Sequence, residues 1–166
     1  MKAMIAIWMT FGGLYAQPPM LARPDSVALF AEGSRHYLNK DYKSAIVPYR
    51  KAIEEEKTDH KLPVPIWRAL VDNLGMSYGI TGDLKAAEEV FRYGLSRDPE
   101  YPIFHYNMAC AAAERNDMEG AMKYLTTAFQ YRKNANPGEP MPDPHKDDSF
   151  QRFMKNAAFR NLIDSL

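Results

Sequence analysis

Apolar and small residues recur at helical spacing along most of the chain, and one stretch of this pattern occurs twice. Leu74, Gly75 and Tyr78 share one face of a helix, with a small residue where a second helix must approach closely. Five positions of the stretch have an identical or similar residue 34 places later: Asn73 and Asn107, Leu74 and Met108, Gly75 and Ala109, Asp83 and Asp117, and Ala87 and Ala121. The pattern predicts two consecutive helical hairpins.

Short polar turns separate the expected helices. Gly82 tolerates the left-handed backbone conformation, and Asp83 can cap the helix that follows. Asn116 and Asp117 take the same places in the second copy. Pro99 ends the first hairpin, because proline cannot continue a helix.

A third, more diverged hairpin precedes these two. Gly33 takes its small position, and Asp41 with Tyr42 turns the chain. Gly33 and Gly75 are 42 residues apart, so eight additional residues separate the first two hairpins. They predict a longer second helix, a loop bounded by prolines, and an early start of the next hairpin at residue 65 or 66.

The period and the order of large and small residues resemble the tetratricopeptide repeat of bacterial type. The resemblance implies three repeats in an all-α fold, a right-handed superhelix of helical hairpins (an α-α solenoid). In this family the first helices of successive repeats line a concave groove that holds an extended peptide or a helix of a partner. By repeat position, ten residues would line the groove here: Phe30, Ser34 and Tyr37 in repeat one, Asp72, Asn73 and Met76 in repeat two, and Tyr106, Asn107, Cys110 and Glu114 in repeat three.

Two of these groove positions are amides, which can both donate to and accept from a partner backbone. Asn73 and Asn107 are therefore the best candidates for partner contacts, and surface filling is the alternative interpretation. Repeat proteins that grip the C-terminal carboxylate of chaperones use Lys and Arg together with Asn. Phe30 and Ser34 stand where that pattern requires Lys and Asn. We therefore expect a neutral to acidic, partly aromatic groove that suits a segment with apolar anchors and a basic residue.

The N-terminus departs from the repeat pattern. Lys2 precedes an uncharged apolar run from Ala3 to Ala16, which indicates a signal peptide at residues 1–16. The alternative is a retained helix that covers the open end of the repeat stack. Residues 17–24 contain three prolines and are expected to form a linker.

Three repeats are then expected at about 25–59, 65–99 and 102–132. Four prolines mark a linker at residues 133–146. Residues 147–166 are expected to form one or two short capping helices, with Asp147, Asp148 or Ser149 as a cap before a set of apolar residues. They would cover the open edge of repeat three, or that of a neighbour in a homodimer, and the open ends of the repeat stack are the alternative dimer contact.

Composition and candidate chemistry change this picture little. The 166 residues include 21 acidic and 21 basic ones without a basic stripe, so no nucleic-acid partner is expected. The charged run Glu54 to Lys57 is interpreted as a solvated helix end. The single cysteine, Cys110, cannot form an internal disulfide and is expected in the core.

Motifs for zinc, nucleotide or metalloprotease sites are absent from the sequence. His145, near Asp143, Asp147 and Asp148, could hold a metal only if the loop folded around it. We therefore expect no catalytic residues, no metal and no cofactor. The apolar run is shorter than the about 20 residues that a membrane span needs, so no stable span is expected in the mature chain.

The leading hypothesis from the sequence is a non-catalytic scaffold for protein–protein interaction, binding a protein or peptide partner in the groove. The apolar run places it in the periplasm, the cell envelope or outside the cell if it is cleaved, and in the cytoplasm otherwise. The alternative is a cytosolic three-repeat chaperone of a secretion system, in which the N-terminal apolar segment is part of the fold.

Overall fold

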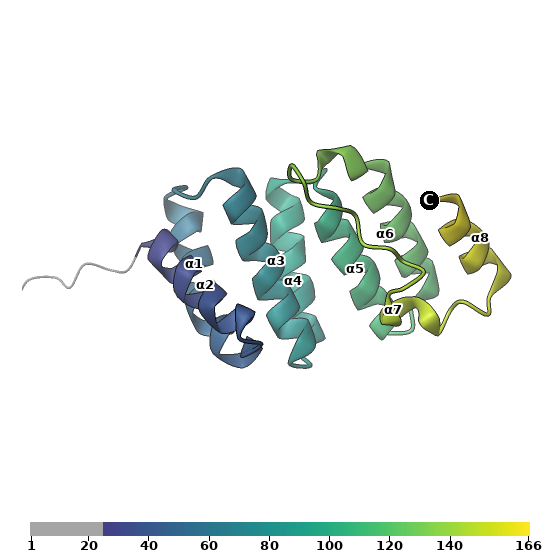
Figure 1. Cartoon of the computed structure of the whole chain (residues 1–166), viewed down its shortest axis with the longest axis horizontal. Helices are drawn as coiled ribbons and strands as arrows, with labels where there is room; N and C mark the ends of the chain where they lie inside the picture. The colour runs from purple at the N-terminus through teal and green to yellow at the C-terminus, as the bar shows by residue number, and fades with distance from the viewer. Residues whose placement is uncertain (1–24) are drawn as a thin grey trace, which may run out of the picture.

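The computed structural model describes residues 25–166, which contain helices and no strand. Six long helices form three antiparallel hairpins that stack side by side (Figure 1). In chain order they are α1 (Ser26–Leu38), α2 (Tyr42–Thr58), α3 (Val64–Ile80), α4 (Leu84–Arg97), α5 (Pro102–Glu114) and α6 (Met118–Gln130). A 3-10 turn, η1 (Arg132–Asn134), and two short helices, α7 (Asp148–Gln151) and α8 (Ala157–Ser165), follow. The predicted signal peptide and the linker at 17–24 lie outside the described residues.

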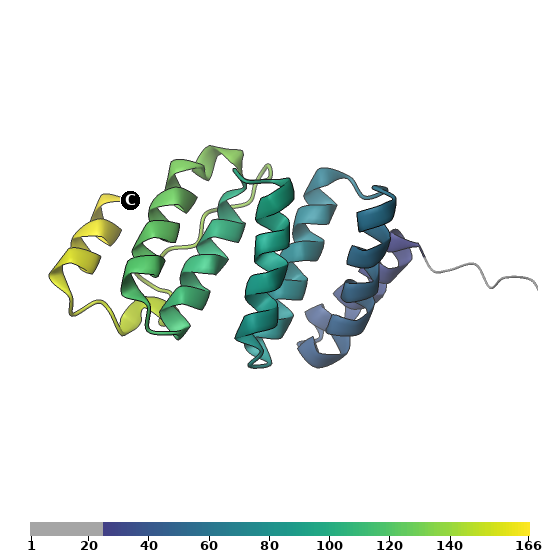
Figure 2. The same cartoon turned by 180° about the vertical axis from the view of Figure 1, so that it is seen from behind.

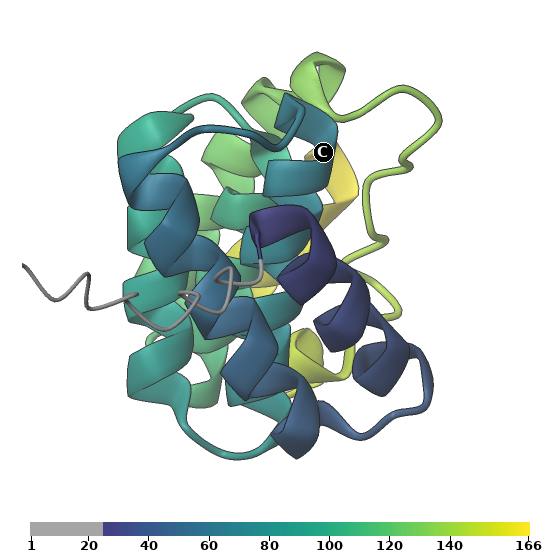
Figure 3. The same ribbon diagram turned by 90° about the vertical axis from the view of Figure 1, so that its left-hand side faces the viewer.

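The first and second helices of the hairpins form two layers. Figure 2 shows the layer of second helices, α2, α4 and α6, and Figure 3 looks along the stack. Each second helix packs against the first helix of its own hairpin; α2 and α4 also pack against the first helix of the next hairpin, and α6 packs against α8. The arrangement confirms the predicted α-α solenoid with capping helices at its C-terminal end.

The turns inside the hairpins have the expected geometry. Gly82 has a φ of 92°, and the Asp83 carboxylate accepts a hydrogen bond from the Ala86 N–H at 3.0 Å. Lys40 and Asn116 adopt the same left-handed region, and each is followed by an Asp that caps the next helix. Helix α2 has 17 residues and α4 has 14, so the second helix of repeat one is longer, as predicted.

The small positions of the first helices are sites of close helix approach. A Cβ atom added at Gly33 would collide with the ring of Tyr49, and one added at Gly75 would collide with the ring of Phe91. In repeat three the equivalent pair is Ala109 and Leu125, both fully buried. Where alanine replaces glycine on the first helix, leucine replaces the aromatic ring on the second helix. The space between the two helices is therefore filled in each repeat.

The C-terminal helices cover repeat three of the same chain. Phe150 and Phe159 are fully buried in a cluster with residues of α5 and α6, and Ile163 is almost fully buried beside them. Asp147 caps α7 by accepting from the Ser149 N–H at 3.0 Å. The apolar edge that repeat three would otherwise expose is therefore closed.

One residue of the charged run was wrongly expected to be solvated. Glu56 is fully buried, and its Oε1 accepts from the Ser26 hydroxyl at 2.7 Å and from the N–H groups of Lys61 and Leu62 at 3.1 Å each. Glu54 is exposed and pairs with Lys57, as expected. Glu56 points inward because it follows the buried Ala52 and Ile53 by four and three residues: Ala52, Ile53 and Glu56 lie on one helix face. It joins the start of α1 to the loop after α2.

We expect Glu56→Ala to lower the free energy of unfolding by about 2–4 kcal/mol, because each buried donor left without an acceptor costs about 1–3 kcal/mol. Urea denaturation followed by circular dichroism measures the change. The control is Glu54→Ala, which removes an exposed ion pair worth at most about 1 kcal/mol. Equal losses for the two variants would show that Glu56 contributes no more than a surface charge.

Candidate functional site

The predicted groove is the face of the first helices α1, α3 and α5, and its part on α1 and α3 is open. Val27, Phe30 and Leu38 recur at helical spacing on the face of α1 that carries Ser34. Val27 is 53% exposed, Leu38 is 80% exposed, and Ile80 at the end of α3 is 50% exposed. We call the apolar surface on these two helices the open face; it consists of Val27, Phe30, Tyr37, Leu38, Met76 and Ile80.

Ser34 and Asn73, two predicted groove residues, meet at the hydroxyl of Tyr49 from α2. This hydroxyl donates to Ser34 Oγ at 3.1 Å and accepts from Asn73 Nδ2 at 3.1 Å. Burial raises the pKa of Tyr49, so its hydroxyl keeps its proton. Phe30 and Tyr37 pack beside the same ring, and burial raises the pKa of Tyr37 to about 12. The polar groove residues therefore hold repeats one and two together.

Asp72 and Asn107 form the equivalent link between repeats two and three. Asn107 Nδ2 donates to Asp72 Oδ1 and joins α5 to α3. Burial raises the pKa of Asp72 to about 7, and the nearby charge of Glu139 acts in the same direction, while the hydrogen bond from Asn107 opposes the shift. Asp72 therefore changes its charge near neutral pH.

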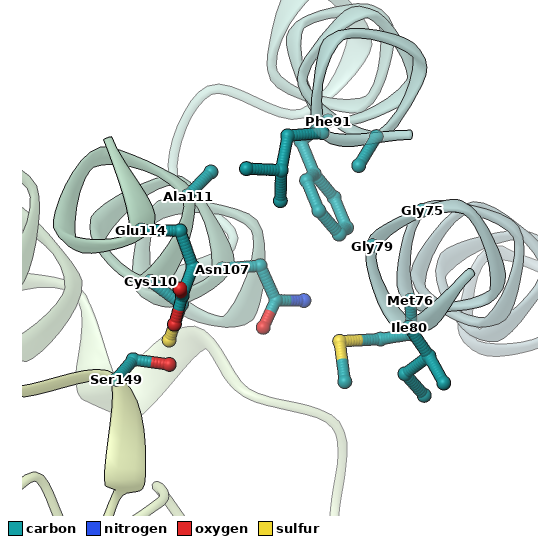
Figure 4. A pocket seen from close by; sticks show the side chains of 12 residues that line it. Gly75, Met76, Gly79, Ile80, Phe91, Asn107, Cys110, Ala111, Glu114 and Ser149 are labelled. Atoms are coloured by element: carbon teal, nitrogen blue, oxygen red, sulfur yellow. The ribbon is translucent and has the colours of Figure 1, made fainter. Parts of the chain in front are cut away.

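A pocket of about 240 Å³ lies between α3 and α5 beside this link. Figure 4 shows Met76 and Ile80 on the α3 side, opposite Asn107 and Cys110 of α5, with Ser149 of α7 at one edge. The pocket is smaller than the about 300–1,000 Å³ of most small-molecule sites. Its size suits one large apolar side chain of a protein partner. It joins the open face through Met76 and Ile80.

The groove face of repeat three is covered. We call residues 135–147 the strap; it runs along the outside of the first-helix layer from the end of α6 to α7 (Figures 1 and 3). Glu139 Oε2 accepts from the Tyr101 hydroxyl at 2.7 Å, and Asp147 Oδ2 accepts from the Tyr106 hydroxyl at 3.0 Å. Tyr106, predicted to face a partner, is 2% exposed and faces the strap instead.

Cys110 and Glu114, the remaining predicted groove residues of repeat three, lie at the edge of the strap. The Cys110 thiol donates to Asp147 Oδ2 at 3.7 Å. Burial, together with the charge of Asp147, raises the pKa of Cys110 well above its usual value, so the thiol stays protonated and unreactive. Glu114 is exposed and pairs with Arg152 at 3.0 Å. Both residues also line the pocket.

Sequence reasoning missed the network that holds the beginning of the strap. Arg68 pairs with Asp98 at 2.7 Å and donates to Asn134 O and to Asn136 Oδ1 at 3.1 Å each. Its guanidinium lies 4.2 Å from the centre of the Tyr101 ring. No local pattern signals contacts between residues so distant in the chain. Leu38 and Ile80 were also not predicted to line the groove. The signal was available, because Leu38 follows Ser34 by four positions and Ile80 follows Met76 by four.

Within residues 25–166, no three His, Cys, Asp or Glu side chains are arranged to hold a metal ion. His145 lies between Asp143 and Asp164, with its Nε2 3.0 Å from Asp164 Oδ1, and Asp147 points to Tyr106. No helix in this part of the chain combines the length and apolarity needed to cross a bilayer.

Comparison with known proteins agrees with the repeat geometry. The sequence model of a family described as tetratricopeptide repeat matches residues 71–101. The crystal structure of the Sgt2 TPR domain from Aspergillus fumigatus matches with a TM-score of 0.57 and 20% identity, over 84% of this chain and 80% of that one. The chain therefore contains a tetratricopeptide repeat at residues 71–101 and has the fold of a tetratricopeptide-repeat domain.

A curated relative matches a shorter stretch. The Sol locus transcriptional repressor of Clostridium acetobutylicum is 32% identical over 62 residues, which are 37% of this chain. The match spans only 20% of the length of that repressor.

We expect the stability of the protein to fall as pH rises from about 4 to about 7. Asp72 has a pKa of about 7 in the folded chain and an ordinary value of 3.8, so the folded state holds this proton more tightly over that window. Asp72→Asn should remove on the order of 2 kcal/mol of this dependence, since one pKa unit corresponds to about 1.4 kcal/mol and solvent screens part of the effect.

Urea denaturation of the wild type and Asp72→Asn at pH 5 and pH 8 measures this difference. Glu114→Gln, which removes an exposed carboxylate from the same region, is the control. A pH dependence that is the same in wild type and Asp72→Asn would rule out Asp72 as its source.

Proposed function

We propose that the chain is a non-catalytic scaffold that binds a protein partner on the open face, with one apolar side chain of the partner in the adjoining pocket. The observation that carries the proposal is the exposure of Val27, Leu38 and Ile80 on the groove side of the first helices. Large apolar side chains that gather on one exposed surface mark interaction sites. The tetratricopeptide fold supports a protein as the partner.

The form of the partner follows from the shape and charge of this surface. Apolar residues on two neighbouring helices, with a pocket at the edge, suit an amphipathic helix or an extended peptide whose anchors are three or four residues apart. Glu114 lines the pocket and places a carboxylate at its polar rim. We therefore propose apolar anchors together with a basic residue in the bound segment.

We expect Ile80→Glu to weaken binding by about tenfold or more, because it places a charge where an apolar anchor is buried. Peptides selected from a display library on the wild-type chain provide the ligands, and calorimetry measures their Kd. The matched control is Val47→Glu, since Val47 is 51% exposed but lies on α2, in the layer of second helices. Equal affinities for both variants, or no enriched peptide, would contradict the proposal.

We further propose that the protein is exported, on the basis of the apolar run at residues 1–16 alone. Intact mass and N-terminal sequencing of the protein from fractionated cells of its own host test this. The expected result is a chain that begins at Gln17 in the envelope or secreted fraction. A chain that begins at Met1 in the soluble cytosol would contradict export and favour the secretion chaperone.

Repression of transcription is not part of the proposal. The match to the clostridial repressor covers a fifth of that protein, and the present chain has equal numbers of acidic and basic residues. Binding to nucleic acid depends on clustered positive charge.

A further inference from the structure

The first part of the strap is held to the repeats mainly by polar contacts. None of residues 135–143 is buried, whereas Phe150 and Phe159 anchor the helices beyond the strap in the core. The closest contacts of this part are polar: Glu139 meets the Tyr101 hydroxyl at 2.7 Å, and Asn136 accepts from Arg68 at 3.1 Å. A segment with this little buried apolar surface can leave its site while the core stays packed.

The strap occupies its site as a bound peptide would. It has no regular secondary structure over residues 139–143, and four prolines at 137, 140, 142 and 144 restrict its backbone. Two carboxylates bind donors at the start of α5 and along it: Glu139 binds Tyr101, the residue before the helix, and Asp147 binds Tyr106 and Cys110. Met141 lies between the two carboxylates in sequence and packs against the core. The face of α5 thus presents a row of hydroxyl and thiol donors to acidic side chains.

We propose that this donor face of α5 is a second peptide site, that its ligand class is an extended acidic segment of a protein, and that the strap is its built-in occupant. The site is separate from the open face, and it goes beyond the proposed function. Cys110 and Ser149 line the pocket, and Cys110 also contacts Asp147. A partner with a side chain in the pocket therefore has its neighbouring residues next to the strap.

Because the strap belongs to the same chain as its site, it competes strongly with any peptide that would replace it. A segment joined by a short linker competes at an effective concentration in the millimolar range. A free acidic segment therefore displaces the strap poorly, and a segment that also binds the open face displaces it well. The strap makes the site selective for partners that contact both surfaces.

The experiment uses the full chain and a synthetic peptide of residues 134–150 as the probe. Glu139→Ala with Asp147→Ser loosens the strap, and Ser at position 147 can still cap α7. We expect the labelled peptide to bind this variant at least about tenfold more tightly than the wild type, because the tethered competitor is weakened. Adding Tyr101→Phe and Tyr106→Phe should abolish the gain.

Cys110 provides an independent readout, because it is the only cysteine in the chain. Ellman's reagent should react with it faster in the loosened variant than in the wild type, and the peptide should slow the reaction again. A peptide with Gln in place of Glu139 and Asn in place of Asp147 should give no protection. Equal protection by both peptides, or an unchanged reaction rate in the loosened variant, would overturn the proposal.

Hydrogen exchange on the wild-type chain tests the proposal even if the variants fold poorly. Millimolar acidic peptide should accelerate exchange at the Asn136 N–H, which donates to Glu139 at 3.0 Å, and the amide peptide should not. No acceleration by the acidic peptide would count against displacement. Val27→Glu, at an open-face residue that does not line the pocket, should leave binding of this peptide unchanged, so failure of the donor face is distinguishable from failure of the open face.

Discussion

The close approach of two helices at a residue with almost no side chain is the contact on which each repeat depends. Gly33 lies against the ring of Tyr49, and Gly75 lies against the ring of Phe91. Because the inner face of the first helix is fixed in this way, the residues about a third of a turn away are directed to the groove. The position of the candidate site thus follows from packing inside the hairpins.

The polar groove residues of this protein have structural roles, so other side chains remain to contact a partner. Ser34 and Asn73 share the hydroxyl of Tyr49, and Asn107 bonds to Asp72. Each of these bonds joins neighbouring repeats or helices, so they set the spacing of the first helices. The side chains that remain without such bonds on the open face are apolar. Recognition by burial of apolar surface, with polar groups that orient the ligand, is the usual arrangement at protein interfaces.

The fold could be predicted from sequence where it depends on local pattern. Gly82 with Asp83, and the 34-residue offset, identify turns and hairpins because glycine conformation, capping and helical spacing act over a few residues. The inward position of Glu56 could have been found from the same spacing. The strap contacts could not, because Tyr101 and Glu139 are 38 residues apart and one of them lies in a proline-rich segment without a period. Burial of Tyr106 was missed for the same reason.

The bonds of Arg68 to Asn134 and Asn136 span 66 and 68 residues, farther than the neighbour-to-neighbour contacts that hold most repeat stacks together. They join repeat two to the segment that follows repeat three. Repeats two and three are therefore joined both directly and through the strap, while repeat one is attached to the stack through α2 and α3. Opening of the junction between repeats two and three therefore also pulls on the strap, whereas opening of the junction between repeats one and two does not.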